Sequence, residues 1–384
     1  MKRWILRTLL GLVLAALFVG IWKWEEINRL LAVNSLFSED KIVGNFSDMQ
    51  GAFLTRTLTR GDGTVSPLPV GPDFTLPLEV EQWITARNVT ALVILKDGEV
   101  VFEDYYLGTG PDDLRIGWSV SKSFLSALFG ILVDDGTIPD LDAPVTDYVP
   151  ELATSAYARA SIRDVLQMSS GIVFDEDYLD QSSDINRMGR VLALGGSMDA
   201  FATGLTETFA EPGTDWQYVS IDTHILSMVA RAATGRPLAE LMEEKLIAPL
   251  GFEADPYYIT DGYGVAFALG GMNARTRDYA RFGQMVAQGG MWQGEQVVPA
   301  DWIDESTVAS APTDPDQTGY GYQWWIPLDG DPGQVMARGI YGQYVWIDRV
   351  RNVVIATNAA DRLFREPGVA RQNEDIFRLI ARSL

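Results

Sequence analysis

Patterns typical of β-strands occur near both ends of the chain, and a long apolar stretch follows the first of them. In "TALVILKDGEVVFEDYYLG", residues 90–108, two runs rich in β-branched and aromatic residues flank Asp97-Gly98. This dipeptide between two strand-like runs predicts a tight hairpin. The apolar stretch then predicts a buried helix over about residues 119–133, which ends at the polar turn of residues 134–136.

The middle of the chain, about residues 140–285, has helical periodicity. Apolar residues recur at spacings of three and four in "SIRDVLQMSS", "IDTHILSMVARAATG" and "TRDYARFGQMVAQGG", and the last two end at glycine. Strand patterns return in "GYGYQWWIP", "ARGIYGQYVWIDR" and "NVVIATNAA", before a last helix in "EDIFRLIARSL". The order predicts an α/β fold in which one sheet is built from N- and C-terminal segments, with a mainly helical domain inserted between them.

The N-terminus combines basic residues with an apolar run. Three basic residues precede an uncharged stretch over residues 9–22, and tryptophans lie on both sides of it. We interpret residues 1–26 as an uncleaved membrane anchor; a cleaved signal peptide is the alternative, although no A-x-A-like site follows. The anchor and the signal peptide both predict that the body is exported. With the anchor, the body would be held at the inner membrane and face the periplasm or the outside. Residues 27–70 are expected to be a tether, and residues 71–384 the folded body.

Composition and charge exclude several classes of function. The chain has 384 residues, 47% of them apolar, and a formal net charge of −22. Such a charge argues against nucleic acid and anionic membrane surfaces as partners. The absence of cysteine and the single histidine exclude disulfides, thiolate chemistry and Cys/His zinc sites. A carboxylate site for calcium or magnesium stays open without support, and no phosphate-binding loop motif occurs.

The strongest chemical signal is Ser119 with Lys122 in "IGWSVSKSFLSALFG". On a helix, residues three apart share one face. A serine hydroxyl needs an adjacent base to become a nucleophile, and lysine serves only if burial lowers its pKa. The apolar run that follows would bury Lys122, which has no acidic residue within eight positions on either side. S-x-x-K alone is a weak signal, since most matches are surface helices.

In its context this stretch resembles the nucleophile motif of the serine β-lactamase and penicillin-recognising hydrolase superfamily. Within it, the chain looks most like the esterase and 6-aminohexanoate-dimer hydrolase branch. "GWSVSKSF", "DWQYVSIDTHIL" and "ARGIYGQYVWID" match three motifs in the expected order, and the resemblance covers about residues 75–384. It implies a class C β-lactamase-like sandwich, with an antiparallel sheet, a helical domain and the active site between them.

The resemblance also implies roles for individual residues: Ser119 as nucleophile, Lys122 as its base and Tyr218 as proton relay to the leaving group. From the residues alone, Tyr218 would be a core tyrosine before a helix. Ser220 replaces the asparagine usual in lactamases and is either the N-cap of the following helix or a polar active-site residue. Tyr178, on an acidic loop, is a candidate for substrate binding, with a solvated loop aromatic as the alternative.

The third motif departs from the lactamase pattern. Lactamases carry Lys-Thr-Gly or His-Thr-Gly there, and the cation helps to bind the substrate carboxylate. Here Ala337 and Arg338 precede Gly339, and strand alternation points Arg338 away from the place of the lysine. The backbone N–H groups of Ile340 and Ser119 are expected to form the oxyanion hole. Substrate contacts are expected from Gly339 and also from Tyr341. β-Lactam hydrolysis is therefore not the expected main activity.

These expectations combine into a serine hydrolase that cleaves an ester or amide bond of a small molecule through an acyl-enzyme on Ser119, with no cofactor. One alternative is a β-lactamase or D-amino-acid-specific peptidase. Another is a non-catalytic, membrane-anchored binding protein, which would not need serine, lysine and tyrosine together. A Ser-His-Asp triad would require His224, but no G-x-S-x-G elbow occurs. We expect His224 to be a hydrogen-bonded histidine of the core or surface.

Overall fold

A large antiparallel sheet organises the body in the computed structural model, which describes residues 2–178 and 180–384. Within these residues it has seven strands in the order β3-β2-β13-β12-β11-β10-β9. N- and C-terminal segments both contribute, which confirms the predicted α/β fold with its antiparallel sheet. The strands are β2 (Val89–Lys96), β3 (Glu99–Tyr105), β9 (Gly319–Tyr320), β10 (Trp325–Ile326), β11 (Gln334–Gly339), β12 (Gln343–Asp348) and β13 (Val353–Ala359).

The predicted hairpin joins β2 and β3. Asp97 and Gly98 form its turn with φ values of 53° and 85°. Positive φ at both central residues is what a type I′ turn requires, and glycine and aspartate accept it more readily than branched residues. Lys96 consequently pairs with Glu99 across the ladder. The turn dipeptide therefore explains the register of the two strands.

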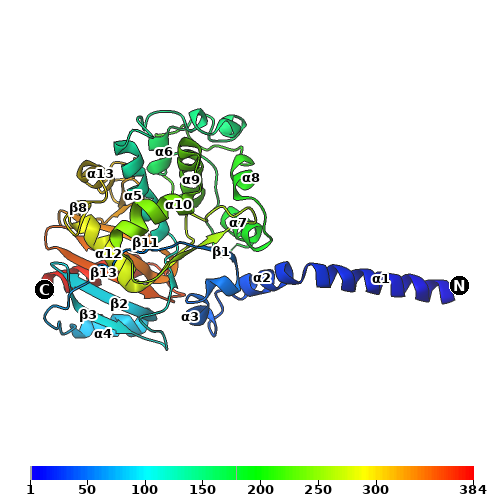
Figure 1. Cartoon of the computed structure of the whole chain (residues 1–384), viewed down its shortest axis with the longest axis horizontal. Helices are drawn as coiled ribbons and strands as arrows, with labels where there is room; N and C mark the ends of the chain where they lie inside the picture. The colour runs from blue at the N-terminus through cyan, green and yellow to red at the C-terminus, as the bar shows by residue number, and fades with distance from the viewer. Residues whose placement is uncertain (1, 179) are drawn as a thin grey trace.

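Helices cover both faces of the sheet (Figure 1). The covering helices are α4 (Leu78–Ala86) and α14 (Val369–Ser383) on one face and α5 (Val120–Asp134) and α12 (Thr276–Ala287) on the other. The rings of Phe124 in α5 and Phe282 in α12 stack with centroids 3.7 Å apart. A Cβ at Gly283 would lie 2.6 Å from side-chain atoms of Val345 and Val354, so the glycine lets α12 approach the sheet closely. This helix, expected within the inserted domain, belongs to the sandwich.

The inserted domain is mainly helical, as predicted, and lies above the sheet in the view of Figure 1. Its elements are η2 (Val145–Asp147), η3 (Pro150–Thr154), α6 (Ile162–Leu166), α7 (Asp184–Ala193), α8 (Met198–Thr203), α9 (Ser220–Thr234), α10 (Leu238–Met242), η4 (Glu243–Ile247) and α11 (Ala248–Leu250). The longest of them, α9, ends at Gly235, whose φ of 66° is the left-handed conformation common after helices. The glycine in the sequence therefore marks the end of the helix.

A second sheet, which the sequence patterns did not predict, lies at the base of α5. Its strands are β1 (Leu54–Thr57), β5 (Tyr257–Thr260), β6 (Met272–Ala274) and β4 (Arg115–Ile116), in that order. Short elements complete the body: β7 (Met291–Trp292), β8 (Glu295–Gln296), α13 (Ala300–Ser306) and η5 (Ile340–Gly342). β4 pairs with β6 just before α5 begins, so this sheet positions the start of that helix.

The segment expected to be a tether packs onto the body instead. Its elements are α2 (Trp24–Asn34), α3 (Ile42–Asn45), η1 (Met49–Gly51) and β1. Leu36, Ile42, Phe46 and Met49 are all buried in the main core. They bury apolar area that a free linker would expose, which stabilises the segment in place. The Gly- and Pro-rich end of the segment concealed this apolar content.

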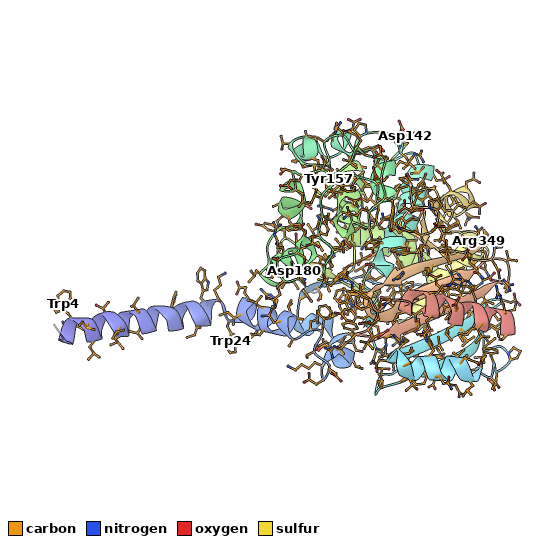
Figure 2. All side chains as sticks on the ribbon, turned by 180° about the vertical axis from the view of Figure 1, so that it is seen from behind. Trp4, Trp24, Asp142, Tyr157, Asp180 and Arg349 are labelled. Atoms are coloured by element: carbon orange, nitrogen blue, oxygen red, sulfur yellow. The ribbon has the colours of Figure 1, made fainter. Side chains whose placement is uncertain are left out.

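The N-terminal helix α1 (Lys2–Trp22) extends away from the body in both whole-molecule views (Figures 1 and 2). Trp4 and Trp22 on it are 77% and 70% exposed. Among the residues that the structure describes, no helix combines the length and the apolar character needed to cross a bilayer. The membrane anchor predicted over residues 1–26 therefore has no support from the structure.

Candidate active site

Ser119 lies where the chain turns from β4 into α5. Trp118, just before it, has a φ of 46°, an uncommon value for a bulky residue. Ser119 occupies the N-cap position, but its side chain makes no capping hydrogen bond. Its hydroxyl is therefore not used to stabilise the helix, and the left-handed turn at Trp118 directs it to the junction between the sheet and the helical domain.

Lys122, one turn into α5, is 1% exposed. Its Nζ donates to Ser119 Oγ at 3.1 Å, Ser220 Oγ at 3.3 Å and the carbonyl of Leu269 at 2.6 Å. All three acceptors are neutral. Burial lowers the pKa of Lys122 to about 7, while the charges of Glu176 and Asp222 act in the opposite direction. A substantial fraction of this amine is consequently neutral near pH 7 and able to accept a proton.

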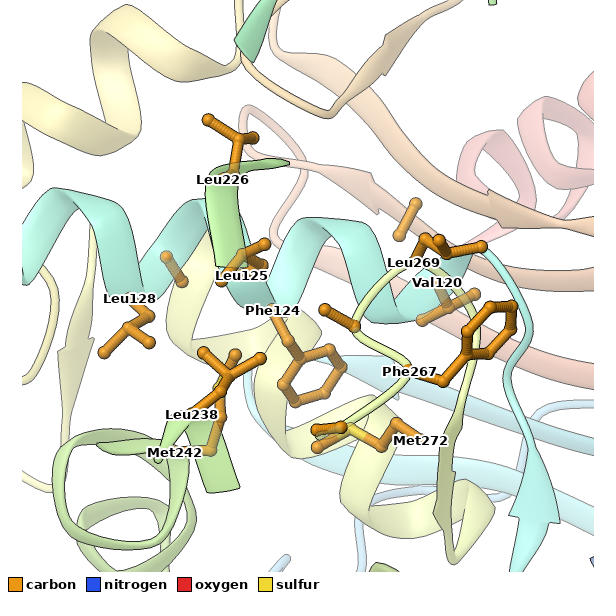
Figure 3. Close-up of a cluster of buried hydrophobic side chains, with 14 of the residues drawn as sticks. Val120, Phe124, Leu125, Leu128, Leu226, Leu238, Met242, Phe267, Leu269 and Met272 are labelled. Atoms are coloured by element: carbon orange, nitrogen blue, oxygen red, sulfur yellow. The ribbon is translucent and has the colours of Figure 1, made fainter. Parts of the chain in front are cut away.

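Apolar side chains of both domains cause this burial. Figure 3 shows Phe124 and Leu125 of α5 packed with Leu226 of α9, and with Leu269 and Met272 from the chain that leads into β6. Water is excluded from this cluster, so an ammonium group at its edge loses hydration that neutral acceptors replace only in part. The apolar run predicted to bury the lysine does so in the structure.

Tyr218 lies just before α9 and completes the arrangement. Its hydroxyl hydrogen-bonds with Ser119, and Lys122 Nζ is 5.3 Å from the centroid of its ring. Burial and the nearby charge of Glu176 raise the pKa of Tyr218 well above its usual value. The phenol therefore keeps its proton at neutral pH and holds it beside Ser119, where it is available for transfer. The structure thus brings together the three residues that the motifs predicted as catalytic.

Gly339 brings the end of β11 against the start of α5. A Cβ on this residue would lie 2.4 Å from the carbonyl oxygen of Gly117 and 3.2 Å from the backbone nitrogen of Ser119. Only glycine permits so close an approach. Within the described residues, the N–H groups of Ser119 and Ile340 donate to no protein acceptor. Two unpaired donors at one junction are the requirement for an oxyanion hole.

Arg338 does not face the serine. Ala337 belongs to the core between the sheet and α5, so the next residue points to the other face. Its guanidinium carbon lies 5.2 Å from the ring centroid of Trp325, and that ring stacks on Tyr218 with centroids 5.1 Å apart. The cation thus reaches Tyr218 through an intervening tryptophan, and the lysine of the lactamase motif has no counterpart at Ala337.

Glu176 is a site residue that the sequence did not reveal. It accepts a hydrogen bond from the backbone N–H of Ser220 at 2.5 Å and another from the Tyr178 hydroxyl at 2.8 Å. Burial raises its pKa, while the charge of Lys122 acts in the opposite direction. In the sequence it lies among acids in "DEDYLD", where carboxylates are usually solvated. No pattern there separated it from its neighbours.

Ser220 has the polar role rather than the capping role. The N-cap of α9 is Val219, and Ser220 Oγ instead accepts the hydrogen bond from Lys122. One half-turn further, Asp222 is fully buried and accepts hydrogen bonds from Tyr157 at 2.6 Å and Ser170 at 2.9 Å. Burial raises the pKa of Asp222 to about 8. The start of α9 therefore supplies two groups near Lys122.

A cavity of about 610 Å³ opens beside Ser119. Its lining includes Ser119 and the predicted residues Tyr178, Ser220, Ile340 and Tyr341. Tyr341 has a φ of 60°, and its ring stacks on Phe37 and lies tilted against Phe364. Lys122, Tyr218 and Gly339 are not part of the described lining, because they lie behind or beside the serine. The predicted substrate-binding residues therefore divide between the cavity wall and its support.

The single histidine is far from a triad arrangement. His224 is fully buried, and its Nε2 lies 2.8 Å from Asp199 Oδ1. Asp199 also accepts hydrogen bonds from Arg231 at 2.6 and 3.1 Å. The structure therefore makes His224 a hydrogen-bonded core histidine of the helical domain, next to the partly exposed ion pair of Asp199 and Arg231.

Comparison with known proteins identifies the family. A model of the β-lactamase family matches residues 80–373, most of the chain. The chain belongs to the β-lactamase family. A 6-aminohexanoate-dimer hydrolase of Paenarthrobacter ureafaciens is 35% identical over 294 residues, which cover 72% of this chain and 74% of the relative. The family resemblance deduced from the motifs is thereby confirmed.

Solved structures of the family share the fold. A Bacillus anthracis protein provisionally assigned as a 6-aminohexanoate-dimer hydrolase superposes with a TM-score of 0.80 at 23% identity, over 90% of this chain and 95% of that one. A family VIII carboxylesterase gives a TM-score of 0.59 at 18% identity, over 83% and 99% of the two chains. Membership in this family of hydrolases, esterases and amidases makes the protein a hydrolytic enzyme.

Proposed function

We propose that the protein hydrolyses an ester or amide bond of a small molecule through an acyl-enzyme on Ser119. The observation that carries the proposal is the buried amine of Lys122, hydrogen-bonded to Ser119 Oγ at 3.1 Å and without an ion pair in the described part of the chain. Burial lowers the pKa of Lys122 to about 7, which suits a general base near neutral pH. The relative named as a 6-aminohexanoate-dimer hydrolase supports an amide or ester substrate.

Acylation begins when neutral Lys122 accepts the proton of the Ser119 hydroxyl. Oγ then forms a bond to the carbonyl carbon of the substrate, and the negative charge that develops on the carbonyl oxygen is stabilised by the N–H groups of Ser119 and Ile340. The bond between that carbon and the leaving oxygen or nitrogen breaks. The leaving group takes a proton from the Tyr218 hydroxyl, which recovers one from the Lys122 ammonium.

Deacylation uses water as the second nucleophile. Lys122, neutral again, accepts a proton from the water, whose oxygen attacks the acyl carbon. The bond to Ser119 Oγ breaks, the serine recovers its proton from Lys122, and the acid product leaves. No metal or organic cofactor takes part in this scheme, because proton transfer and oxyanion stabilisation are all supplied by side chains and backbone.

β-Lactam hydrolysis is not the main activity that we propose. The small side chain of Ala337 stands where lactamases carry a cation, and Arg338 lies over Trp325 rather than beside the serine. A substrate carboxylate would therefore lack its usual partner there. We also retain export of the body as a proposal that rests on the basic, apolar N-terminus; fractionation of expressing cells tests it.

The test compares the full-length protein with its Ser119→Ala variant on three substrates: a short-chain p-nitrophenyl ester, the linear 6-aminohexanoate dimer and a chromogenic cephalosporin. A fluorophosphonate probe is applied in parallel, and mass spectrometry locates the labelled residue. We expect turnover of the ester or the dimer, its loss in the variant, and labelling of Ser119. Circular dichroism checks that both proteins are folded.

Other outcomes would change the assignment. Turnover of the cephalosporin alone would place the protein among lactamases and overturn the argument from Ala337. If none of the three substrates is hydrolysed and the fluorophosphonate does not label Ser119, a non-catalytic binding protein would be favoured. Turnover that survives Ser119→Ala would contradict the proposed nucleophile.

A further inference from the structure

Part of the cavity beside Ser119 is formed by chain that precedes the matched family region. The match begins at residue 80, whereas Val33, Leu36, Phe37 and Phe53 all line the cavity. We refer to these four residues as the N-terminal wall. They belong to the segment whose sequence pattern predicted a tether, so its contribution to a substrate cavity was not foreseen.

The N-terminal wall is held firmly in place. Leu36 is 2% exposed, and the ring of Phe37 stacks on Tyr341 with centroids 4.8 Å apart and an interplanar angle of 13°. The carbonyl of Phe46 accepts a hydrogen bond of 3.0 Å from the N–H of Ile116, just before Ser119. α2 lies beside α7 (Figure 1). A wall fixed at several points can discriminate between substrates by shape.

The position of Tyr218 decides which half of the substrate enters the cavity, given the function proposed above. Ser119 and Ile340 line the cavity, whereas Tyr218 is not part of the described lining and stacks on Trp325 behind it. The leaving group must take its proton from the Tyr218 hydroxyl and therefore departs on that side. The acyl half then extends from the carbonyl carbon into the cavity.

The chemistry of the lining indicates an apolar acyl chain. Opposite the N-terminal wall, α7 contributes Ile185, Met188 and Leu192. Although the whole chain has a net charge of −22, the described lining contains no aspartate or glutamate and includes Arg190 and Arg362. Arg362 is paired with Glu39 at 2.9 Å, and that carboxylate lies outside the described lining, so an ammonium group at the end of the acyl chain would find no carboxylate in the lining to pair with. A chain that ends in a methyl group has no charge to desolvate or to be repelled there, and it buries apolar area along its whole length.

We propose that the cavity binds an uncharged, linear acyl chain of about six to ten carbons, and that the N-terminal wall limits its length. The enzyme would then differ in acyl preference from an enzyme that accepts 6-aminohexanoyl groups. Its specificity would be determined in part by residues that precede the region matched by the family model.

The test measures kcat/KM of the full-length protein for p-nitrophenyl acetate, hexanoate, octanoate and decanoate, and for the 6-aminohexanoate ester. Val33→Phe adds volume at the wall, and Leu36→Ala removes it. Leu31→Phe is the matched control, because Leu31 lies on the same helix, is 60% exposed and does not line the cavity. Labelling of Ser119 by a small fluorophosphonate verifies that each variant retains a folded site.

For the unmodified protein we expect octanoate to exceed acetate, and hexanoate to exceed 6-aminohexanoate by about tenfold. Val33→Phe should lower kcat/KM for octanoate and decanoate about tenfold and leave acetate within about twofold. Leu36→Ala should move the optimum toward decanoate. Leu31→Phe should change neither profile.

Several results would overturn the inference. If Val33→Phe lowers kcat/KM equally for acetate and octanoate, the N-terminal wall has only a structural role. If the unmodified protein prefers 6-aminohexanoate to hexanoate, the argument from the charge of the lining is refuted. A flat chain-length profile with Ser119-dependent acetate hydrolysis would contradict the acyl cavity while leaving the proposed function intact. If the unmodified protein hydrolyses no ester and Ser119 is not labelled, the proposed function itself fails.

Discussion

Two neighbouring helices on one face of the sheet each bury a cation, but the partners of the two cations differ. On α12, Arg281 is 1% exposed, and its guanidinium lies 2.6 Å from Asp278 and 2.7 Å from Glu253. On α5, Lys122 is equally buried, but its hydrogen bonds in the described part of the chain go to two hydroxyls and a carbonyl. Depth of burial is the same, whereas the charge of the partners and the intrinsic basicity of the two cations both differ.

This difference separates a structural cation from a chemical one. A buried cation that faces carboxylates stays charged, because its lost hydration is replaced by opposite charge. A buried lysine that faces only neutral acceptors lowers its cost by releasing its proton, and its pKa falls to about 7. Lys122 thus becomes a base, whereas Arg281 ties α12 to the chain around Glu253.

The largest effect should follow from Lys122→Met, which removes the base and keeps an apolar side chain of similar length. We expect kcat/KM for a short-chain ester to fall about 10⁴-fold, because Ser119 loses its proton acceptor. The free energy of unfolding should rise by about 1–4 kcal/mol at pH 7, since a desolvated amine is replaced by an apolar group. Ester kinetics and urea denaturation measure the two quantities.

The size of the stability change depends on pH. Between about pH 7 and 10.5 the unfolded lysine binds a proton that the folded lysine releases, so the wild type loses stability as pH falls through this window. The advantage of methionine should therefore be larger at pH 7 than at pH 10. Activity within tenfold of the wild type would show that Lys122 is not the base.

The next largest effect should come from Arg281→Met. In contrast to Lys122→Met, this substitution should lower stability and leave catalysis nearly unchanged. Removing the guanidinium leaves the buried carboxylate of Asp278 without its cation, while Glu253 keeps Arg275 and Arg277. We expect the free energy of unfolding to fall by about 3 kcal/mol. The kcat/KM per folded molecule should stay within about threefold, because the partners of Arg281 are Ser66, Asp278 and Glu253, none of which lines the cavity. Denaturant unfolding measures the free energy of unfolding, and titration of active sites with a fluorophosphonate gives the concentration of folded enzyme needed for kcat/KM. A variant that stays stable but loses activity would contradict the assignment of Arg281 as a structural cation.

The acids around the two cations already differ in the sequence, although the sequence analysis considered only Lys122. Asp278 precedes Arg281 by three residues, which indicates an ion pair on one helix face, whereas Lys122 has no acid within eight positions. Local patterns of this kind also predicted the hairpin at Asp97-Gly98 and the burial of α5. They work because the cause, a turn dipeptide or an apolar run, lies within a few residues of its effect.

What the sequence missed depends on contacts between distant segments. Glu176 reaches Ser220 across 44 positions, and nothing in its acidic loop indicated that contact. Phe37 meets Tyr341 only because the N-terminal segment folds back onto the body. β1 is four residues long and became visible only through its pairing with β5. Short, long-range elements carry too little local pattern to be predicted.

A smaller effect should follow from Glu176→Gln, which sharpens the role of charge around Lys122. The carboxylate of Glu176 raises the pKa of Lys122, so its removal should lower that pKa further. Because the base must be neutral, kcat/KM rises with pH through the Lys122 pKa, and the acid limb should move to lower pH by about one unit. The pH dependence of kcat/KM measures the shift. Tyr178→Phe removes the hydrogen bond to Glu176 but keeps the charge of that carboxylate, so the acid limb of kcat/KM should not move in this variant. If the limb shifts in both variants, altered packing rather than charge is the cause.

The smallest kinetic effect should come from Asp222→Asn, on the same helix as Ser220. Asp222 also raises the pKa of Lys122, but less than Glu176 does, and its own pKa of about 8 leaves it mostly protonated at pH 7. The acid limb should therefore move by less than half the shift seen in Glu176→Gln. Between about pH 4 and 8 the folded carboxyl binds a proton that the unfolded one releases, so the wild type loses stability as pH rises through this window.

Asparagine has no proton to lose there, so the stability of Asp222→Asn relative to the wild type should increase from pH 5 to pH 8 and then level off. Urea denaturation at several pH values measures this difference. Tyr157 and Ser170 still find an acceptor in the asparagine carbonyl, so the hydrogen bonds at 2.6 and 2.9 Å are retained in kind. A constant difference across the range would mean that Asp222 is ionised in the fold, and that Lys122 has a second buried carboxylate nearby besides Glu176.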